Sequence, residues 1–296
     1  MDRIKELEVF TEIAAAGSLA AAGRRLNLSP PAVTRILSGL EDRLGVRLVQ
    51  RTTRNLHLTE AGLRFRASAH RLLEDMDAAE REAAGAGLVP QGRVAVTAST
   101  SFGRLAVAPV FAAYLDAHPR VQGSLQLWDR NVNLIEEGID VAVRIGALPD
   151  TGLIARRLGA VRRILVASPE YLARMGAPAG PDDLALHRFI AFRGLMPTDR
   201  ILFDGATRAV TPWLEINDAL SAVRLAEAGY GITVALSYMT LPQIAEGSLV
   251  EVLPDVAPPA RPVHLVWPEA RLPTPAVRAF LDHAHPKLSS ALAGAG

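Results

Sequence analysis

The sequence predicts a multi-domain protein in which an α-helical N-terminal part precedes a larger α/β part. Three observations indicate this fold class. Residues 18–41 have the pattern of two short helices joined by a tight turn, residues 59–86 carry a heptad-like apolar stripe, and strands alternate with helices after Gly92. A chain of 296 residues is long enough for two or three such domains.

The region of the two short helices contains residues that are suited to end and begin helices. Gly17 suits the end of a first helix, and Ser18 suits the N-cap of a second helix that runs to about residue 26. Asn27 suits the left-handed conformation of a turn. Ser29 and Pro30 suit the N-cap and first position of a third helix. The pattern is typical of a helix-turn-helix, which places one helix in the DNA major groove.

Arginine is concentrated in and after this region, although the formal net charge of the chain is only +1. Two short runs of alternating polarity, residues 46–49 and 55–58, predict a two-stranded wing with arginines near its tip. Such a local basic patch suits contacts with phosphates, and the alternative is a solvated surface or pairing with Glu41 and Asp42. The arginines are Arg24, Arg25, Arg35, Arg43, Arg47, Arg51 and Arg54.

A long helix is predicted from Thr59 to about residue 86. Its apolar positions recur at alternating spacings of four and three residues, which is the pattern of a coiled-coil seam. A long helix with one narrow apolar stripe predicts a helical partner, and packing against its own chain is the alternative. The seam residues are Phe65, Ala69, Leu72, Met76, Ala79 and Ala83.

The α/β part begins after a glycine- and proline-containing linker at residues 85–92. Strands are expected at 93–97, 121–128, within 138–145 and at 162–167, with a helix at 102–118, and this alternation predicts a mainly parallel sheet. Ser99, Thr100 and Ser101 precede that helix, whose free N–H groups could bind an anion. On the residues alone, ordinary N-capping explains these three side chains better.

Several function classes are not predicted. The chain has no cysteine, which excludes disulfides, thiolate metal sites and cysteine nucleophiles. Of the seven histidines only His283 and His285 are close together, and no HExxH, GxSxG, P-loop or GxGxxG motif occurs, so no enzyme, metal or cofactor is expected. A solute-binding protein or an enzyme-like α/β protein remains the alternative for the second part. With no signal peptide or membrane segment visible, we expect a cytoplasmic protein.

The chain resembles the LysR-type transcriptional regulators over nearly its whole length. The opening MDRIKELEVF, the stretch AAAGRRLNLSPPAVTRILSGLEDRLGVRLVQRTTR and the closing LTEAG resemble the DNA-binding domain of the family. GRVAVTAS, EEGIDVAVRIGALPDTGLIARRLG, ASPEYLARMGAPAGPDDLALHRFI and EGSLVEVLPD resemble its effector domain. Three residues depart from the usual family pattern, namely Gly23, Pro30 and Ile36.

The resemblance implies a domain organisation. It implies a winged helix-turn-helix at 1–58, a linker and dimerisation helix at 59–88, and an effector-binding domain of periplasmic-binding-protein type at 89–296. Lobe I would comprise about 92–162 and 266–296, and lobe II about 163–265, with crossings near 161–164 and 261–266. The expected partners are an operator in double-stranded DNA, a small-molecule effector, a homodimer or homotetramer, and RNA polymerase as a further candidate.

The resemblance also implies site residues. Base and phosphate contacts are expected from the third helix and the wing, namely Ser29, Pro30, Pro31, Thr34, Arg35, Arg51 and Arg54. The effector, a small carboxylate or aromatic acid, is expected between the lobes against Ser99, Thr100, Ser101, Phe102, Arg144, Phe203 and Asn217. Asn217 is also expected to cap a helix that begins at Ala219. The sequence does not identify the effector, the target genes or the sign of regulation.

Overall fold

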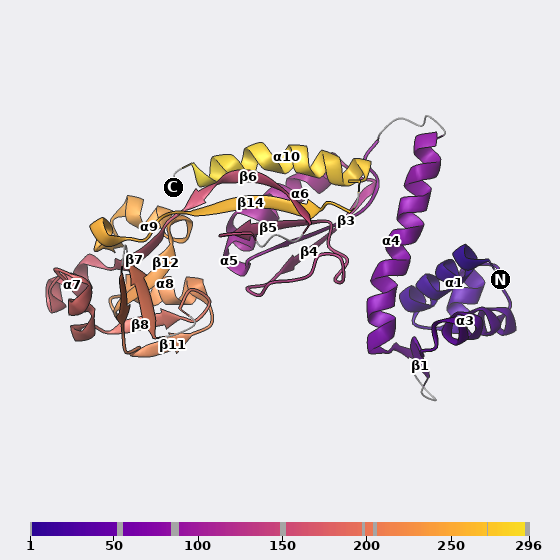
Figure 1. The fold of residues 1–296 in the computed structure, drawn as a ribbon, viewed down its shortest axis with the longest axis horizontal. Coiled ribbons are helices and arrows are strands. Elements are labelled where there is room, and N and C mark those ends of the chain that lie inside the picture. Colours follow the sequence, from indigo (N-terminus) through magenta and orange to yellow (C-terminus); the bar gives the residue numbers. More distant parts are fainter. Residues whose placement is uncertain are drawn as a thin grey trace.

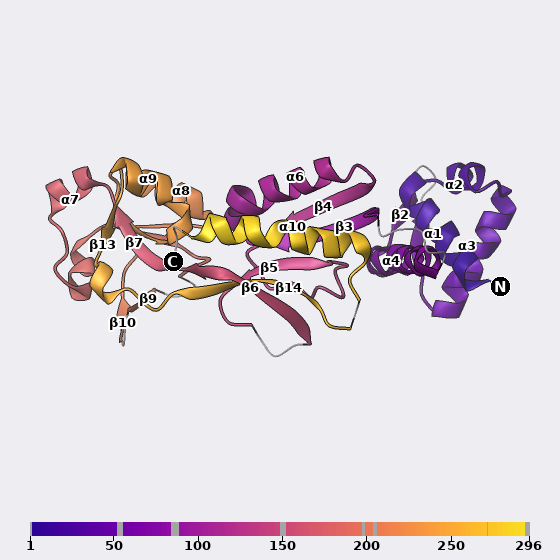
Figure 2. The ribbon, with the colours of Figure 1, turned by 90° about the horizontal axis from the view of Figure 1, so that it is seen from above.

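The computed structural model describes residues 2–51, 56–83, 89–148, 152–196, 199–203, 206–270 and 272–293. An N-terminal helical unit, a long helix and two α/β lobes follow one another along the molecule (Figure 1). The long helix stands across the long axis of the lobes, so that it is seen end-on from above (Figure 2). No helix among the described residues is long and apolar enough to cross a membrane.

The N-terminal unit is a winged helix-turn-helix. Its elements are α1 (Arg3–Ala16), α2 (Leu19–Arg25), α3 (Pro30–Leu44), β1 (Val49–Arg51) and β2 (Leu56–Leu58). The predicted helix ends are confirmed, since Gly17 ends α1 with φ 61° and Ser18 and Ser29 accept the amides of Ala21 and Ala32. Asn27 has φ 54°, as expected for the turn. The wing strands pair in antiparallel fashion, and the first begins at residue 49 and not at 46.

Gly23 has a packing reason in this unit. A Cβ at this position would lie 2.8 Å from the carbonyl oxygen of Leu28 and 3.3 Å from a methyl group of Val33. The absence of a side chain therefore allows α2 to approach the turn and α3 closely, which offsets the roughly 1 kcal/mol that a mid-helix glycine costs.

The long helix α4 (Glu60–Ala83) belongs partly to the N-terminal core. The rings of Phe65 and Phe10 lie 5.3 Å apart, and Ala69 is fully buried in the same cluster. The first two positions of the predicted seam thus pack against their own chain, which was the alternative interpretation. Leu72 is 56% exposed and Met76 is half-buried, while the side chains of Ala79 and Ala83 lie outside the described residues.

Lobe I is built on a five-stranded sheet in the order β4-β3-β5-β14-β6. Because β14 runs antiparallel to β5 and β6, the sheet is mixed, and the prediction of a mainly parallel sheet holds only for β3, β4 and β5. The helical segment predicted at 102–118 starts at Thr100 and contains a π-helical turn, Gly103–Val107. The elements are β3 (Gly92–Ala98), α5 (Thr100–Phe102), α6 (Ala108–Ala117), β4 (Val121–Leu127), β5 (Val141–Ile145), β6 (Leu153–Val161), β14 (Arg261–Pro268) and α10 (Pro275–Leu292).

Lobe II has a second mixed sheet in the order β11-β8-β12-β7-β13, and a separate antiparallel hairpin of β9 and β10. Strands β11, β8 and β12 are parallel, and β7 and β13 run against their neighbours. The elements are β7 (Arg163–Ala167), α7 (Pro169–Met175), β8 (Phe189–Phe192), β9 (Arg200–Phe203), β10 (Ala206–Ala209), β11 (Leu214–Ile216), α8 (Ala219–Glu227), β12 (Ile232–Leu236), α9 (Leu241–Glu246) and β13 (Val250–Val252), with short 3₁₀ turns at Pro181–Leu186, Ser237–Met239 and Pro254–Val256.

The chain crosses between the lobes twice. The first crossing joins β6 to β7 at Arg162, within the predicted range 161–164. The second crossing lies between β13 and β14, at residues 253–260. The predicted crossing at 261–266, and the lobe boundary at 265, are wrong because β14 pairs with β6 of lobe I from Arg261 onward.

Three half-buried histidines are expected to make stability depend on pH. Burial lowers the pKa of His187, His264 and His283. An unfolded histidine binds a proton below its ordinary pKa of about 6.5, whereas these three histidines stay neutral in the folded protein until a lower pH. The folding stability that is present above pH 6.5 is therefore lost as the pH falls. Thermal unfolding of wild type and His283→Phe at pH 7.5 and 5.5 checks this. The variant should lose less stability on acidification than wild type, and an equal loss in both would contradict the expectation for His283.

Candidate functional site

The outer face of α3 is exposed to solvent, and its inner face packs into the core of the N-terminal unit. Ser29, Pro30, Pro31 and Arg35 are exposed and Thr34 is half-buried. On the inner face Val33, Ile36, Leu37 and Leu40 are buried. Ile36 therefore belongs to the core, which explains an apolar residue there.

The arginines of this region divide into two groups. Arg25 binds Glu12 at 2.8 Å, Arg47 binds Glu41 at 2.8 Å, and Arg43 binds Glu6 through its Nε at 3.1 Å. For these three the alternative of pairing with carboxylates holds. Within the described ranges Arg24 and Arg35 make no ion pair. The side chain of Arg51 and the whole of Arg54 lie outside the described residues.

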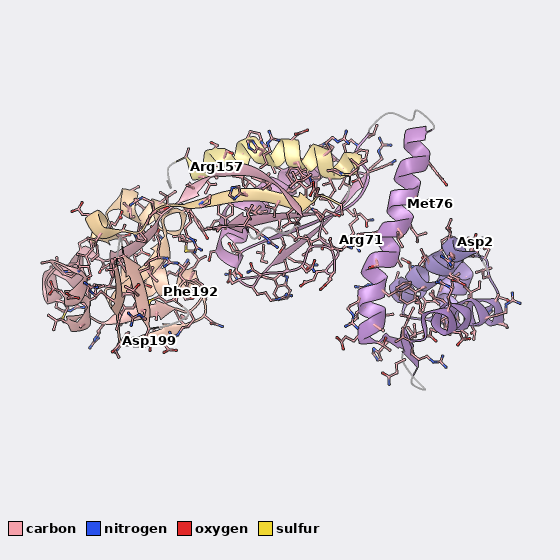
Figure 3. The ribbon with its side chains drawn as sticks, viewed as in Figure 1. Asp2, Arg71, Met76, Arg157, Phe192 and Asp199 are labelled. Atoms are coloured by element: carbon pink, nitrogen blue, oxygen red, sulfur yellow. The ribbon has the colours of Figure 1, made fainter. Side chains whose placement is uncertain are left out.

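A cavity of about 230 Å³ lies between the lobes and is lined by both of them. Phe192, on the side of lobe II that faces lobe I, is part of its wall (Figure 3). Its polar and charged lining includes Thr97, Ser99, Ser101, Asp129, Arg130, Asn131, Arg144, Tyr238 and Arg261, and its apolar lining includes Trp128, Phe192, Leu195, Leu236 and Met239. A helix-turn-helix joined to two lobes around such a cavity combines a DNA-reading surface with a place for a small ligand.

Two family models match the chain. The model described as "Bacterial regulatory helix-turn-helix protein, lysR family" matches residues 4–63, and "LysR substrate binding domain" matches residues 88–289. This chain belongs to the LysR family of transcriptional regulators. Regulators of this family bind DNA operators and small-molecule effectors, and they form oligomers.

Individual relatives agree with the family models over the full length. The HTH-type transcriptional regulator CrgA of Neisseria meningitidis serogroup B is 33% identical over 98% of both chains. The HTH-type transcriptional activator AaeR of Escherichia coli K12 is 30% identical over 91% of this chain and 88% of that one. A solved structure of CrgA superposes with a TM-score of 0.62 at 32% identity, covering 96% of this chain and 98% of that chain.

The structure brings only part of the predicted effector set together in the regulator. Ser99, Ser101 and Arg144 line the interlobe cavity, and Thr100 and Phe102 do not. Phe102 is buried behind the wall, where its ring meets that of Tyr238 edge-on at 5.0 Å. The Thr100 amide donates to Asp129 Oδ1 at 2.9 Å.

Two members of the predicted set lie elsewhere in lobe II. Phe203 ends strand β9 and is buried in a separate core with Ile201 and Val234, so its expected place at the cavity is wrong. Asn217 is exposed and does not line the cavity. It does not cap α8 either, because Asp218 accepts the amide and hydroxyl of Ser221 at 2.8 and 2.6 Å. These hydrogen bonds from Ser221 lower the pKa of Asp218.

The sequence did not predict eight of the polar or aromatic residues that line the cavity, namely Thr97, Trp128, Asp129, Arg130, Asn131, Phe192, Tyr238 and Arg261. Trp128, Asp129 and Arg130 directly follow β4, at the carboxyl end of a strand in the parallel part of the sheet, where ligands gather in such folds. That position was the available signal. Tyr238 directly follows β12 of lobe II, and Arg261 begins β14 immediately after the second crossing between the lobes.

The cavity contains polar groups that the described residues leave unsatisfied. The hydroxyls of Ser99 and Tyr238 are buried, and neither makes a hydrogen bond of normal geometry with a described residue. Burial raises the pKa of Tyr238, and the nearby Ser99 hydroxyl opposes part of that shift. Burial also lowers the pKa of Arg144, which donates to the Val132 carbonyl at 2.8 Å. Buried polar groups without a partner are uncommon in folded proteins, and these two hydroxyls both belong to residues that line the cavity.

Proposed function

We propose that this regulator reads its operator with the exposed face of α3 and with the wing. The observation that carries the proposal is Arg35, which is exposed on α3 and has no ion pair with a described residue, while its neighbours Val33 and Ile36 hold the core. A free arginine on this face suits bidentate contact with guanine or phosphate. The further proposed contacts are Ser29, Pro30, Pro31, Thr34, Arg51 and Arg54.

The proposed contacts divide by chemistry. Pro30 and Pro31 offer only apolar contacts, such as those with thymine methyl groups, and Thr34 offers both a hydroxyl and a methyl group. Arg51 and Arg54 in the wing suit phosphates or a narrow minor groove. Base readout by α3 then rests on few polar side chains, so DNA shape contributes to specificity.

Arg35→Ala tests the proposed readout. We expect operator affinity to fall by about tenfold to a hundredfold, the range of 1–3 kcal/mol for one good arginine contact, with the fold retained. The measurement is a gel-shift titration on an operator that wild-type protein has selected from random-sequence DNA. Arg120→Ala, which removes an exposed charge from lobe I, is the matched control. Equal affinity of Arg35→Ala and wild type would refute the assignment.

For the effector we propose a small organic or aromatic acid in the interlobe cavity, in contact with Ser99, Ser101 and Arg144. Thr100 and Phe102 lie next to this wall without lining it. Phe203 and Asn217 lie away from the cavity and are not among the proposed contacts. The observation in favour is a cavity with a desolvated arginine and unsatisfied hydroxyls. A panel of organic acids should raise the melting temperature of wild type, and Arg144→Met should abolish the response.

For the assembly we propose that α4 pairs with a second copy through Leu72, Met76, Ala79 and Ala83, giving a homodimer or homotetramer. The exposed Leu72 supports this, because isolated apolar side chains in a heptad pattern favour a helical partner. We further propose domains at 1–58, 59–88 and 89–296, no enzymatic activity, a cytoplasmic location, and RNA polymerase as a candidate partner.

A further inference from the structure

The charges of the interlobe cavity have both signs. Among the residues that line it, Asp129, Arg130, Arg144 and Arg261 are charged. Arg130 is neutralised locally, because its guanidinium binds both carboxylate oxygens of Glu137 at 2.8 and 3.2 Å. The charges left for a ligand are therefore one acid, Asp129, and two arginines.

The two arginines lie on neighbouring strands of the cavity wall. Arg144 is on β5 and Arg261 begins the neighbouring strand β14. Neither pairs with a carboxylate in the part of the chain that the structure describes, and Arg144 donates to the carbonyl of Val132. Two half-buried guanidinium groups without a carboxylate suit an anionic ligand group.

The acid lies on the other side of β3. Asp129 follows β4, which the sheet order separates from β5 by one strand, so the backbones of Asp129 and Arg144 stand about two strand spacings, roughly 10 Å, apart. Oδ1 of Asp129 accepts the Thr100 amide at 2.9 Å. One amide of the helix start at which an effector anion was expected thus already binds a carboxylate of the chain itself. An incoming carboxylate there would meet a like charge.

Tyr238 is a further polar residue of the cavity wall. The residue lines the cavity and is more than nine-tenths buried, and its hydroxyl is itself buried, without a hydrogen bond of normal geometry to a described residue. Burial raises the pKa of Tyr238, the Ser99 hydroxyl opposes part of that shift, and the charge of Asp129 adds to it. Asp129 and Tyr238 both line the cavity. A ligand in the cavity finds an acceptor in the exposed carboxylate of Asp129.

We propose that Asp129 selects the effector by charge, and that the effector is a zwitterionic α-amino acid whose carboxylate binds Arg144 and Arg261 and whose ammonium group binds Asp129. This inference rests on the proposed effector site and narrows its ligand class. A simple carboxylate of the same skeleton would gain the arginine contacts and leave Asp129 without a partner. An amine of the same skeleton would gain the contact with Asp129, but its positive charge would be repelled by the two arginines.

The test compares matched ligands on the full-length protein. Isothermal titration calorimetry is performed with two triplets: phenylalanine, 3-phenylpropanoate and 2-phenylethylamine, and leucine, 4-methylpentanoate and 3-methylbutylamine. In at least one triplet wild type should bind the amino acid about tenfold more tightly than the carboxylate, which corresponds to one charge-assisted hydrogen bond. Asp129→Asn, which keeps an oxygen for the Thr100 amide, should remove that preference. Asp116→Asn, at an exposed acid of α6, should keep it.

The remaining outcomes separate this inference from the proposed site. If the carboxylate binds as tightly as the amino acid, or if Asp129→Asn leaves the ratio unchanged, charge selection by Asp129 is wrong. If Arg144→Met abolishes the binding of that carboxylate or amino acid, the result still supports the proposed effector site. If binding survives Arg144→Met, the proposed site fails as well. If wild type binds no member of either triplet, the amino-acid class is overturned.

Discussion

Gly62→Ala is expected to destabilise the N-terminal unit by about 2–3 kcal/mol, although alanine is the better helix former by about 1 kcal/mol. A Cβ at position 62 would lie 2.0 Å from the carbonyl oxygen of Leu48 and 3.0 Å from its carbonyl carbon. Both obstacles are backbone atoms, which cannot rotate away as a flexible side chain does. The first turn of α4 would have to move off the segment that leads into the wing.

Hydrogen bonds resist that movement. The Thr59 amide donates to Leu48 O at 3.0 Å, and the Thr59 hydroxyl donates to Arg47 O at 2.7 Å while it accepts the Gly62 amide at 3.0 Å. A shift that relieves the contact breaks at least one of these bonds, so the clash is not removed without cost.

Hydrogen exchange of the α1–α3 amides in full-length protein measures the effect, because a whole-chain melting curve mixes several domains. Protection of these amides should fall in Gly62→Ala. Gly180→Ala is the matched control, since no heavy atom lies within 4 Å of the added Cβ and φ is −158°, which any residue adopts. Unchanged protection in Gly62→Ala would show that the backbone at residues 47–48 can move to admit the added Cβ without loss of stability, and the expected destabilisation would be wrong.

The parts of the fold that the sequence predicted depend on local chemistry. Gly17, Ser18, Asn27 and Ser29 determine their own helix ends and turn, so their positions could be read without knowledge of tertiary contacts. Phe65 illustrates the limit. Its place in the heptad pattern indicates that it is buried, but a pattern does not say whether the covering surface belongs to the same chain or to a partner, and here Phe10 covers it.

The parts that the sequence did not predict depend on contacts between distant segments. Arg261 joins the sheet of lobe I by pairing with Val161, one hundred residues earlier, and nothing in its neighbourhood along the chain signals that partner. Asp129 accepts the amide of Thr100, which is supplied by the strand–helix junction beside β4. One of the N–H groups at this helix start is therefore occupied by a carboxylate of the chain itself, which could not be read from the residues around Thr100.

Glu41→Ala is expected to destabilise the N-terminal unit by about 3 kcal/mol and to abolish operator binding by releasing the wing. Glu41 is 4% exposed, and its Oε1 accepts the amides of Leu48 and Val49 at 2.8 and 3.0 Å. Removal of the carboxylate leaves two buried amides without an acceptor, at about 1–3 kcal/mol each. Exchange of the Leu48 and Val49 amides, measured together with operator affinity, checks this result.

The ion pair that Glu41 makes is not the source of this stability. Its partner Arg47 is 76% exposed, so Arg47→Ala should cost less than about 1 kcal/mol. Glu41→Gln keeps an oxygen that can accept both amides, and it should retain most of the stability lost in Glu41→Ala. If Glu41→Gln were as damaging as Glu41→Ala, the charge of Glu41 would be what holds the wing. If instead neither variant changed the stability or the operator affinity, the amides of Leu48 and Val49 would have another acceptor. The expected order, Glu41→Ala well below Glu41→Gln and Arg47→Ala near wild type, identifies Glu41 as a buried acceptor that joins α3 to the wing.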